Sequence, residues 1–136
     1  MISARQAALV RQDWARTAPI KAQTARAFYA NLFQAAPETK PLFRGDMELQ
    51  GQKLVNTLGF VLDHLDDPEA LLPAARALAI RHVGYGVTAD HYDRVGEALL
   101  QTLEDLLGAD FADEARRAWV AVYDHVAGEM KRAAYA

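Results

Sequence analysis

A run of apolar residues at helical spacing ends in a histidine, and this run constrains the fold more than any other segment. Leu71, Ala75, Leu78 and His82 follow one another at steps of four, three and four residues. That spacing places all four side chains on one face of a helix. The helix must end soon afterwards, because Gly84 follows His82 within one turn. We therefore expect the His82 imidazole to face an apolar interior.

Two interpretations of His82 are open at this point. A single histidine on an apolar face is most often a core residue whose ring nitrogens are satisfied by hydrogen bonds. The alternative is a metal ligand, because neutral imidazole binds iron, zinc and copper. The choice depends on whether the rest of the chain builds a cavity opposite His82.

The remaining segments predict helices and no strands. Capping residues, prolines and glycines indicate helices over about 3–16, 19–36, 46–65, 68–84, 88–107 and 110–130, with a short proline-bounded turn over 37–43. In particular, we expect Asp110 to cap the last helix. No segment alternates apolar and polar residues with a period of two. The sequence therefore predicts an all-α protein of six to eight helices packed around a pocket.

Composition narrows the class of function. The 136 residues are about half apolar and carry a net charge of -3, which is typical of one soluble globular domain over 1–136. Cysteine is absent, so disulfides, thiolate metal sites and cysteine nucleophiles are excluded. There is no basic tract and no apolar run of membrane-spanning length. We expect a cytoplasmic protein with no nucleic-acid and no membrane partner.

Three residues outside the His82 helix are candidates for an opposing wall. Phe43 lies where a proline-bounded turn meets a glycine turn, Tyr29 lies on an inward helix surface, and Gln50 precedes the apolar stripe of its helix by one turn. Each has a plain explanation: Phe43 fills a gap, Tyr29 bonds a backbone carbonyl, and Gln50 is exposed. Together with His82, they describe a slot with one nitrogen ligand on one side and two hydrogen-bonding groups on the other.

Several segments jointly resemble the bacterial single-domain globins and the globin domains of flavohaemoglobins. These segments are Phe28-Tyr29-Ala30-Asn31-Leu32-Phe33, Pro41-Leu42-Phe43, Gln50 with Leu54, Arg81-His82, and His91-Tyr92 with Val95-Gly96. The resemblance extends from the first helix to about Met130. It implies a globin fold, a three-over-three helical sandwich that encloses haem b.

The resemblance also implies roles for individual residues. His82 would be the iron ligand and Phe43 would stack on the porphyrin. Tyr29 and Gln50 take the two distal positions that act on bound ligand and on any catalysis, and Leu54 closes the distal side.

Further positions match those that line the haem in these families. They are Phe28, Leu42, Leu58, Leu78, Val87, Tyr92, Val95, Tyr123 and Met130. From charge and placement, we also expect Lys53 and Arg81 to pair with the haem propionates.

The function implied is reversible binding of O2, NO and CO at a five-coordinate haem iron. It would serve oxygen binding and delivery, and NO detoxification if an external reductase returns the iron to the ferrous state. Because the chain ends at Ala136, we expect no flavin reductase domain within it. An alternative is a haem-based sensor, or a globin that docks on a partner without turnover. We expect a monomer or a weak homodimer.

The sequence departs from flavohaemoglobins at one position. Those proteins carry a glutamate late in the last helix, which pairs with the tyrosine equivalent to Tyr92 and makes the proximal histidine more electron-donating. A gap-free alignment from Trp119 places Ala134 there, with no acidic residue nearby. The departure predicts weak peroxidase-like activation.

Overall fold

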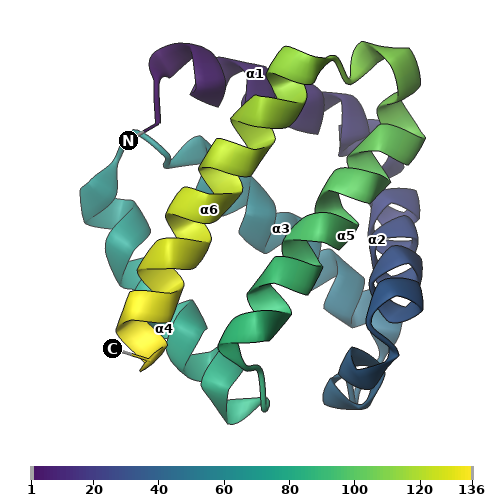
Figure 1. Ribbon diagram of the computed structural model, residues 1–136, viewed down its shortest axis with the longest axis vertical. Helices are drawn as coiled ribbons and strands as arrows, with labels where there is room; N and C mark the ends of the chain where they lie inside the picture. Colours follow the sequence, from purple (N-terminus) through teal and green to yellow (C-terminus); the bar gives the residue numbers. More distant parts are fainter. Residues whose placement is uncertain (1, 136) are drawn as a thin grey trace.

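The computed structural model describes residues 2–135, and over that range it contains helices and no strands (Figure 1). The all-α prediction is therefore confirmed. The elements in chain order are α1 (Ala4–Thr17), η1 (Ala18–Ile20), α2 (Lys21–Ala35), η2 (Pro37–Leu42), α3 (Met47–Asp63), α4 (Pro68–Gly84), α5 (Ala89–Leu107), η3 (Gly108–Asp110) and α6 (Asp113–Tyr135).

Side-chain caps fix where several helices begin. Ser3 and Gln6 form a reciprocal capping box at α1, and the Asp46 carboxylate accepts from the Glu48 N–H at 2.9 Å at α3. The expected cap of the last helix is wrong, because Asp110 lies in the 3-10 turn η3. Phe111 then leaves the helical region (φ −88°, ψ 74°), so α6 begins three residues after Asp110.

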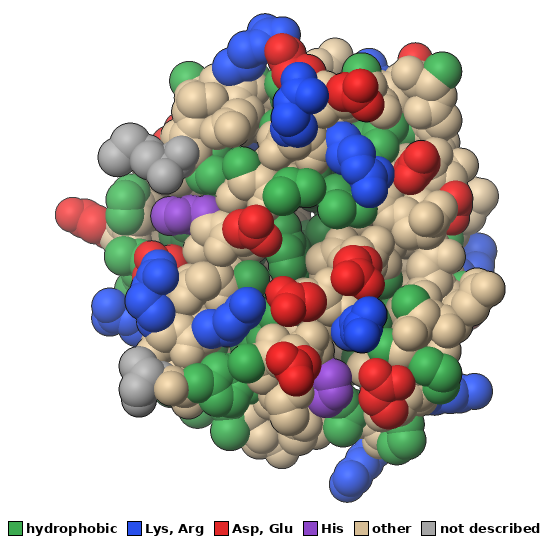
Figure 2. Space-filling view, viewed as in Figure 1, with side chains coloured by type: hydrophobic (Ala, Val, Ile, Leu, Met, Phe, Trp, Pro, Cys, Tyr) green, Lys and Arg blue, Asp and Glu red, His purple; other side chains and the backbone are tan. Residues whose placement is uncertain are grey.

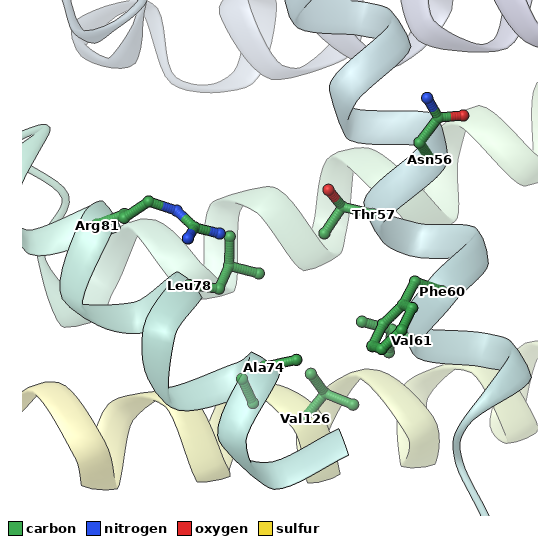
Figure 3. Close-up of a pocket in the computed structure, with 9 residues that line it drawn as sticks. Asn56, Thr57, Phe60, Val61, Ala74, Leu78, Arg81 and Val126 are labelled. Carbon is green, nitrogen blue, oxygen red and sulfur yellow. The ribbon is translucent and has the colours of Figure 1, made fainter. Parts of the chain in front are cut away.

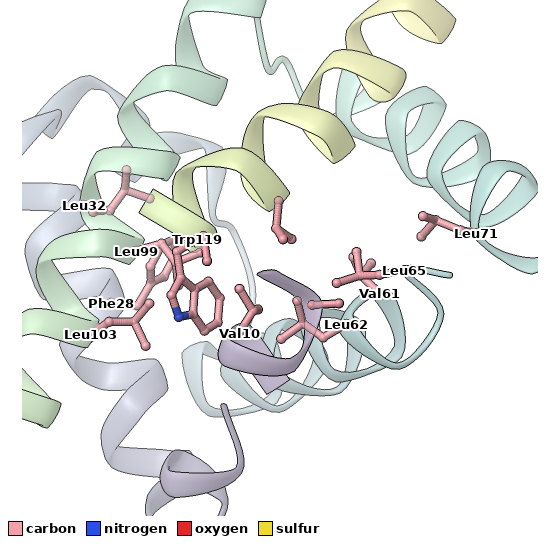
Figure 4. Packing of buried hydrophobic residues seen from close by; sticks show 14 of the residues in the cluster. Val10, Phe28, Leu32, Val61, Leu62, Leu65, Leu71, Leu99, Leu103 and Trp119 are labelled. Atoms are coloured by element: carbon pink, nitrogen blue, oxygen red, sulfur yellow. The ribbon is translucent and has the colours of Figure 1, made fainter. Parts of the chain in front are cut away.

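The main core forms where α1, α2, α5 and α6 meet. Trp119, Leu32, Leu103 and Val10 are fully buried there (Figure 4). Burying a large apolar side chain of this kind stabilises the fold by roughly 1.5–3 kcal/mol. The indole N–H of Trp119 donates to the buried carboxylate of Asp13 at 3.1 Å, so the polar edge of the tryptophan is satisfied inside the core.

Two glycines permit close helix crossings. A Cβ at Gly51 of α3 would lie 2.9 Å from the Cβ of Ala25 on α2, and a Cβ at Gly96 of α5 would lie 2.8 Å from the Tyr123 ring on α6. Both separations are shorter than a carbon–carbon contact of about 3.5 Å. Glycine at these positions therefore sets how closely α2 approaches α3 and α5 approaches α6.

Helices α3 and α4 pack against different parts of the molecule. α4 packs mainly on α6, whereas α3 packs on α2 and α1. Figure 1 shows α5 and α6 side by side across the front of the molecule, with α3 passing behind them. This arrangement leaves α3 and α4 facing one another without close packing between them.

The outer surface carries both signs of charge. Acidic and basic side chains alternate over the α5–α6 face, with no large area of a single charge (Figure 2). In residues 2–135, no helix combines the length and the apolar character needed to cross a membrane.

Candidate functional site

A cleft of about 270 Å³ lies between α3 and α4 (Figure 3). Its lining comes from three helices and comprises Asn56, Thr57, Phe60, Val61, Ala74, Ala75, Leu78, Arg81 and Val126. Most of these side chains are apolar. Thr57 and Arg81 face one another near the rim in Figure 3, so the cleft combines an apolar interior with a cationic edge.

Sequence reasoning named only part of this lining. Leu78 and Arg81 were expected to contact a bound group, and both line the cleft. Thr57 and Phe60 were missed, although helical spacing could have found them. Thr57 follows Leu54 by three residues, which places it on the same helix face as that predicted residue.

His82 lies near the end of α4 and is half-buried. Its Nδ1 is 2.8 Å from the carbonyl oxygen of Leu78, one helical turn earlier. A carbonyl oxygen can only accept, so Nδ1 carries a proton, and in the neutral ring Nε2 then keeps its lone pair. Burial lowers the pKa of His82. The hydrogen bond to Leu78 partly opposes this effect, and the positive charge of Arg81 lowers the pKa further. His82 is thus a neutral imidazole with one ring nitrogen available to a metal.

An aromatic cluster belongs to the α2–α3 side of the molecule. Tyr29 packs edge-on against Phe43 with 5.2 Å between ring centroids, and it stacks on Phe33 at 5.8 Å. Burial raises the pKa of the Tyr29 phenol to about 12, while hydrogen bonding to the Gln50 side chain partly opposes that rise. The structure therefore brings together Tyr29, Phe43 and Gln50, the three residues expected to form one wall.

A second cluster, here called the Tyr92 cluster, lies beside His82. Its buried members are Ala75, Ala79, Tyr92, Ala127 and Met130. Tyr92 is buried, and its ring lies nearly parallel to that of His82 at 6.3 Å between centroids. The Tyr123 hydroxyl donates to the Tyr92 carbonyl oxygen at 2.5 Å. Burial raises the pKa of Tyr92 to about 12, so its hydroxyl stays protonated near neutral pH. Among the described residues, this hydroxyl has no hydrogen-bond partner.

Other residues that were predicted to line the haem pack against one or both of the hydrophobic clusters. Leu54, Leu58 and Val95 pack against the main core, whereas Met130 and Val87 belong to the Tyr92 cluster. Tyr123 and Val126 pack against both.

Of four further predicted residues, Arg81 lines the cleft, whereas Phe28, Leu42 and Lys53 do not. Phe28 is 4% exposed and sits in the main core, beside Leu103 in Figure 4. Leu42 lies against the α4–α5 corner, where a Cβ at Gly86 would come within 3.3 Å of its side chain. Lys53 and Arg81 are both exposed, and of the two only Arg81 lines the cleft, so their pairing with propionates stays a prediction.

Comparison with known proteins identifies the family. The family model described as globin matches residues 26–130. The chain belongs to the globin family. A flavohemoprotein of Bordetella parapertussis is 34% identical over 146 aligned residues, covering 100% of this chain and 35% of that relative. A globin-like protein of Aquifex aeolicus is 38% identical over 104 residues, covering 76% of this chain and 73% of that relative.

A flavohemoprotein of Chromobacterium violaceum is also matched over only part of its length, with 35% identity over 106 residues, covering 76% of this chain and 26% of that relative. This globin thus spans about a third of the length of the flavohemoproteins it matches. The resemblance seen in the sequence and the all-α globin fold are both confirmed.

Membership of the family implies a haem, and the donor chemistry of His82 fits one, although His82 is not among the residues that line the cleft. The neutral imidazole of His82 supplies a nitrogen donor of the type that haem iron takes from histidine. The cleft between α3 and α4 offers apolar walls, and Arg81 places a cation at its rim. Haem is a flat, largely apolar group with anionic propionates, so an apolar cleft with a cation at its edge suits it.

Proposed function

We propose that this globin holds haem b through Nε2 of His82 and binds O2, NO and CO reversibly. The observation that carries the proposal is the hydrogen bond between His82 Nδ1 and the Leu78 carbonyl. It commits one ring nitrogen to the helix, fixes the tautomer and leaves the other nitrogen free. The haem, when bound, supplies the iron at which the gases bind.

We assign the remaining roles in holding the haem and binding the gas to other residues of the chain. Phe43 and Leu54 provide apolar surface that excludes water and holds the flat group in one orientation. We assign the O–H and N–H donors of the ligand side to Tyr29 and Gln50, whose side chains are hydrogen-bonded to each other. We assign Arg81 to a propionate, since its guanidinium lines the rim of the cleft.

A second activity is supported by the flavohemoprotein relatives and by the Tyr29–Gln50 pair. We propose that NO and O2 are converted to nitrate at the same site. That conversion takes up one electron, which an external reductase would supply. Tyr29 would orient the ligand by donating its hydroxyl proton in a hydrogen bond, and its raised pKa keeps that proton in place near neutral pH.

An absorption spectrum of the purified protein tests the proposal. We expect a haem Soret band that shifts reversibly with CO and with O2. His82→Gly should lose haem, and added imidazole should restore an imidazole-ligated spectrum. His64→Ala is the matched control, because His64 Nδ1 makes the same kind of bond to the Phe60 carbonyl at 2.7 Å. Full haem retention by His82→Gly without imidazole contradicts the assignment.

A further inference from the structure

The penultimate residue of the chain is bonded to the corner that follows His82. The Tyr135 hydroxyl, near the end of α6, donates to the carbonyl oxygen of Val87 at 2.6 Å. The two residues are 48 positions apart, so this bond joins the C-terminal turn of α6 to the α4–α5 connection. Tyr135 is 41% exposed, so general burial does not explain the placement of its hydroxyl.

Val87 is itself bonded to the backbone of His82. The Val87 N–H donates to the His82 carbonyl oxygen at 3.0 Å, and the Tyr85 N–H donates to the same oxygen at 3.1 Å. The corner depends on Gly86, whose φ of +92° is in the region that favours glycine. A single residue, Val87, therefore connects the Tyr135 hydroxyl to the main chain of His82.

A second connection runs through side chains. The Tyr135 ring packs edge-on against the Tyr92 ring, with 6.5 Å between centroids and an interplanar angle of 86°. Tyr92 in turn lies nearly parallel to the His82 ring at 6.3 Å. Tyr135 thus reaches both the backbone of His82, through Val87, and its imidazole, through Tyr92.

We propose that Tyr135 is a positioning residue for His82, holding the corner and the Tyr92 ring in the arrangement that orients the imidazole. This inference rests on the proposed function, in which His82 holds the haem iron. Removing the hydroxyl frees the Val87 carbonyl, and removing the ring also takes away a packing neighbour of the Tyr92 ring. The orientation of the imidazole then becomes less restricted, although no residue in contact with the cleft has changed.

The first test does not depend on haem. Hydrogen exchange, followed by mass spectrometry on the purified protein, reports how often the 83–88 segment opens. Loss of one hydrogen bond in Tyr135→Phe should speed exchange of this segment roughly 2- to 10-fold. Tyr85→Phe is the matched control: Tyr85 also lies beside His82, at 6.0 Å between centroids, but is outside the Tyr135–Val87 bond. Unchanged exchange in Tyr135→Phe overturns the proposal.

The second test separates positioning from a merely structural role. In the ferrous, ligand-free protein, the iron–imidazole stretching band in a resonance Raman spectrum reports how the histidine is held. We expect Tyr135→Phe to shift or broaden this band, Tyr135→Ala to do so further, and Tyr85→Phe to leave it unchanged. A lower melting temperature with an unmoved band overturns the positioning role. Absence of haem from the wild-type protein refutes the proposed function instead, while the exchange result still decides whether Tyr135 holds the corner.

Discussion

Tyr92 and Ala134 lie in the same apolar cluster, and the Tyr92 hydroxyl is buried there without a hydrogen-bond partner among the described residues. A buried hydroxyl left unpaired costs about 1–3 kcal/mol of stability. Alanine offers no acceptor where the resemblance to flavohaemoglobins predicts a glutamate. The placement of Ala134 against this cluster agrees with the gap-free alignment.

Removal of the unpaired hydroxyl should therefore be tolerated. We predict that Tyr92→Phe leaves the free energy of unfolding unchanged or raises it by up to about 1–3 kcal/mol. Tyr123→Phe is the matched control, because the Tyr123 hydroxyl donates to the Tyr92 carbonyl at 2.5 Å and its loss should destabilise the fold. Urea unfolding of both variants provides the comparison. Equal destabilisation by the two would mean that the Tyr92 hydroxyl has a partner.

Alanine at position 134, beside Tyr92, also predicts weak peroxidase activity. His82 Nδ1 faces the neutral carbonyl oxygen of Leu78 at 2.8 Å, so the ring gains little electron density from its partner. We expect low peroxidase turnover in the wild-type protein and higher turnover in Ala134→Glu. The double variant Ala134→Glu/Tyr92→Phe shows whether the gain requires the hydroxyl. A wild-type rate equal to that of a flavohaemoglobin assayed in parallel would refute this prediction.

The approach of α5 to α6 is set by a single glycine. A Cβ at Gly96 would lie 2.8 Å from the Tyr123 ring, so Gly96→Ala must displace that ring. We predict a loss of about 1–3 kcal/mol in the free energy of unfolding, which is typical of overpacked cores. Gly84→Ala serves as the control, since its Cβ would meet nothing within 4 Å. Thermal denaturation of the two variants checks this prediction, which fails if both melt alike.

Local signals predicted most of the fold, and tertiary contacts account for what they missed. The His82 stripe and the Ser3 and Asp46 caps are readable because periodicity and caps act within one or two turns. The bond between Tyr135 and Val87 spans 48 residues and has no local signature.

Haem binding should stabilise the protein. A ligand that binds only the folded state raises stability by mass action, by about 4.1 kcal/mol at a concentration 1,000 times its dissociation constant. Without it, the apolar side chains of Phe60, Leu78 and Val126 line an open cleft. We therefore predict that haem-free protein melts at a clearly lower temperature than the haem complex in a calorimetric comparison. Equal melting temperatures would contradict haem binding in the cleft between α3 and α4.

The ring of Tyr29 is restrained by Phe33 and Phe43, at 5.8 and 5.2 Å between centroids, so its hydroxyl should be held better than the Gln50 amide. A hydrogen bond to a partly charged acceptor is worth roughly 1.5–3 kcal/mol, which corresponds to about a 10- to 150-fold change in rate. We predict that Tyr29→Phe speeds O2 release by more than tenfold, that Gln50→Leu has a smaller effect, and that CO release hardly changes because bound CO carries little charge. Stopped-flow release of both gases from both variants decides the matter. A larger O2 effect in Gln50→Leu, or equal shifts for the two gases, would mean that Tyr29 is not the principal donor and that Gln50 or cavity shape controls release.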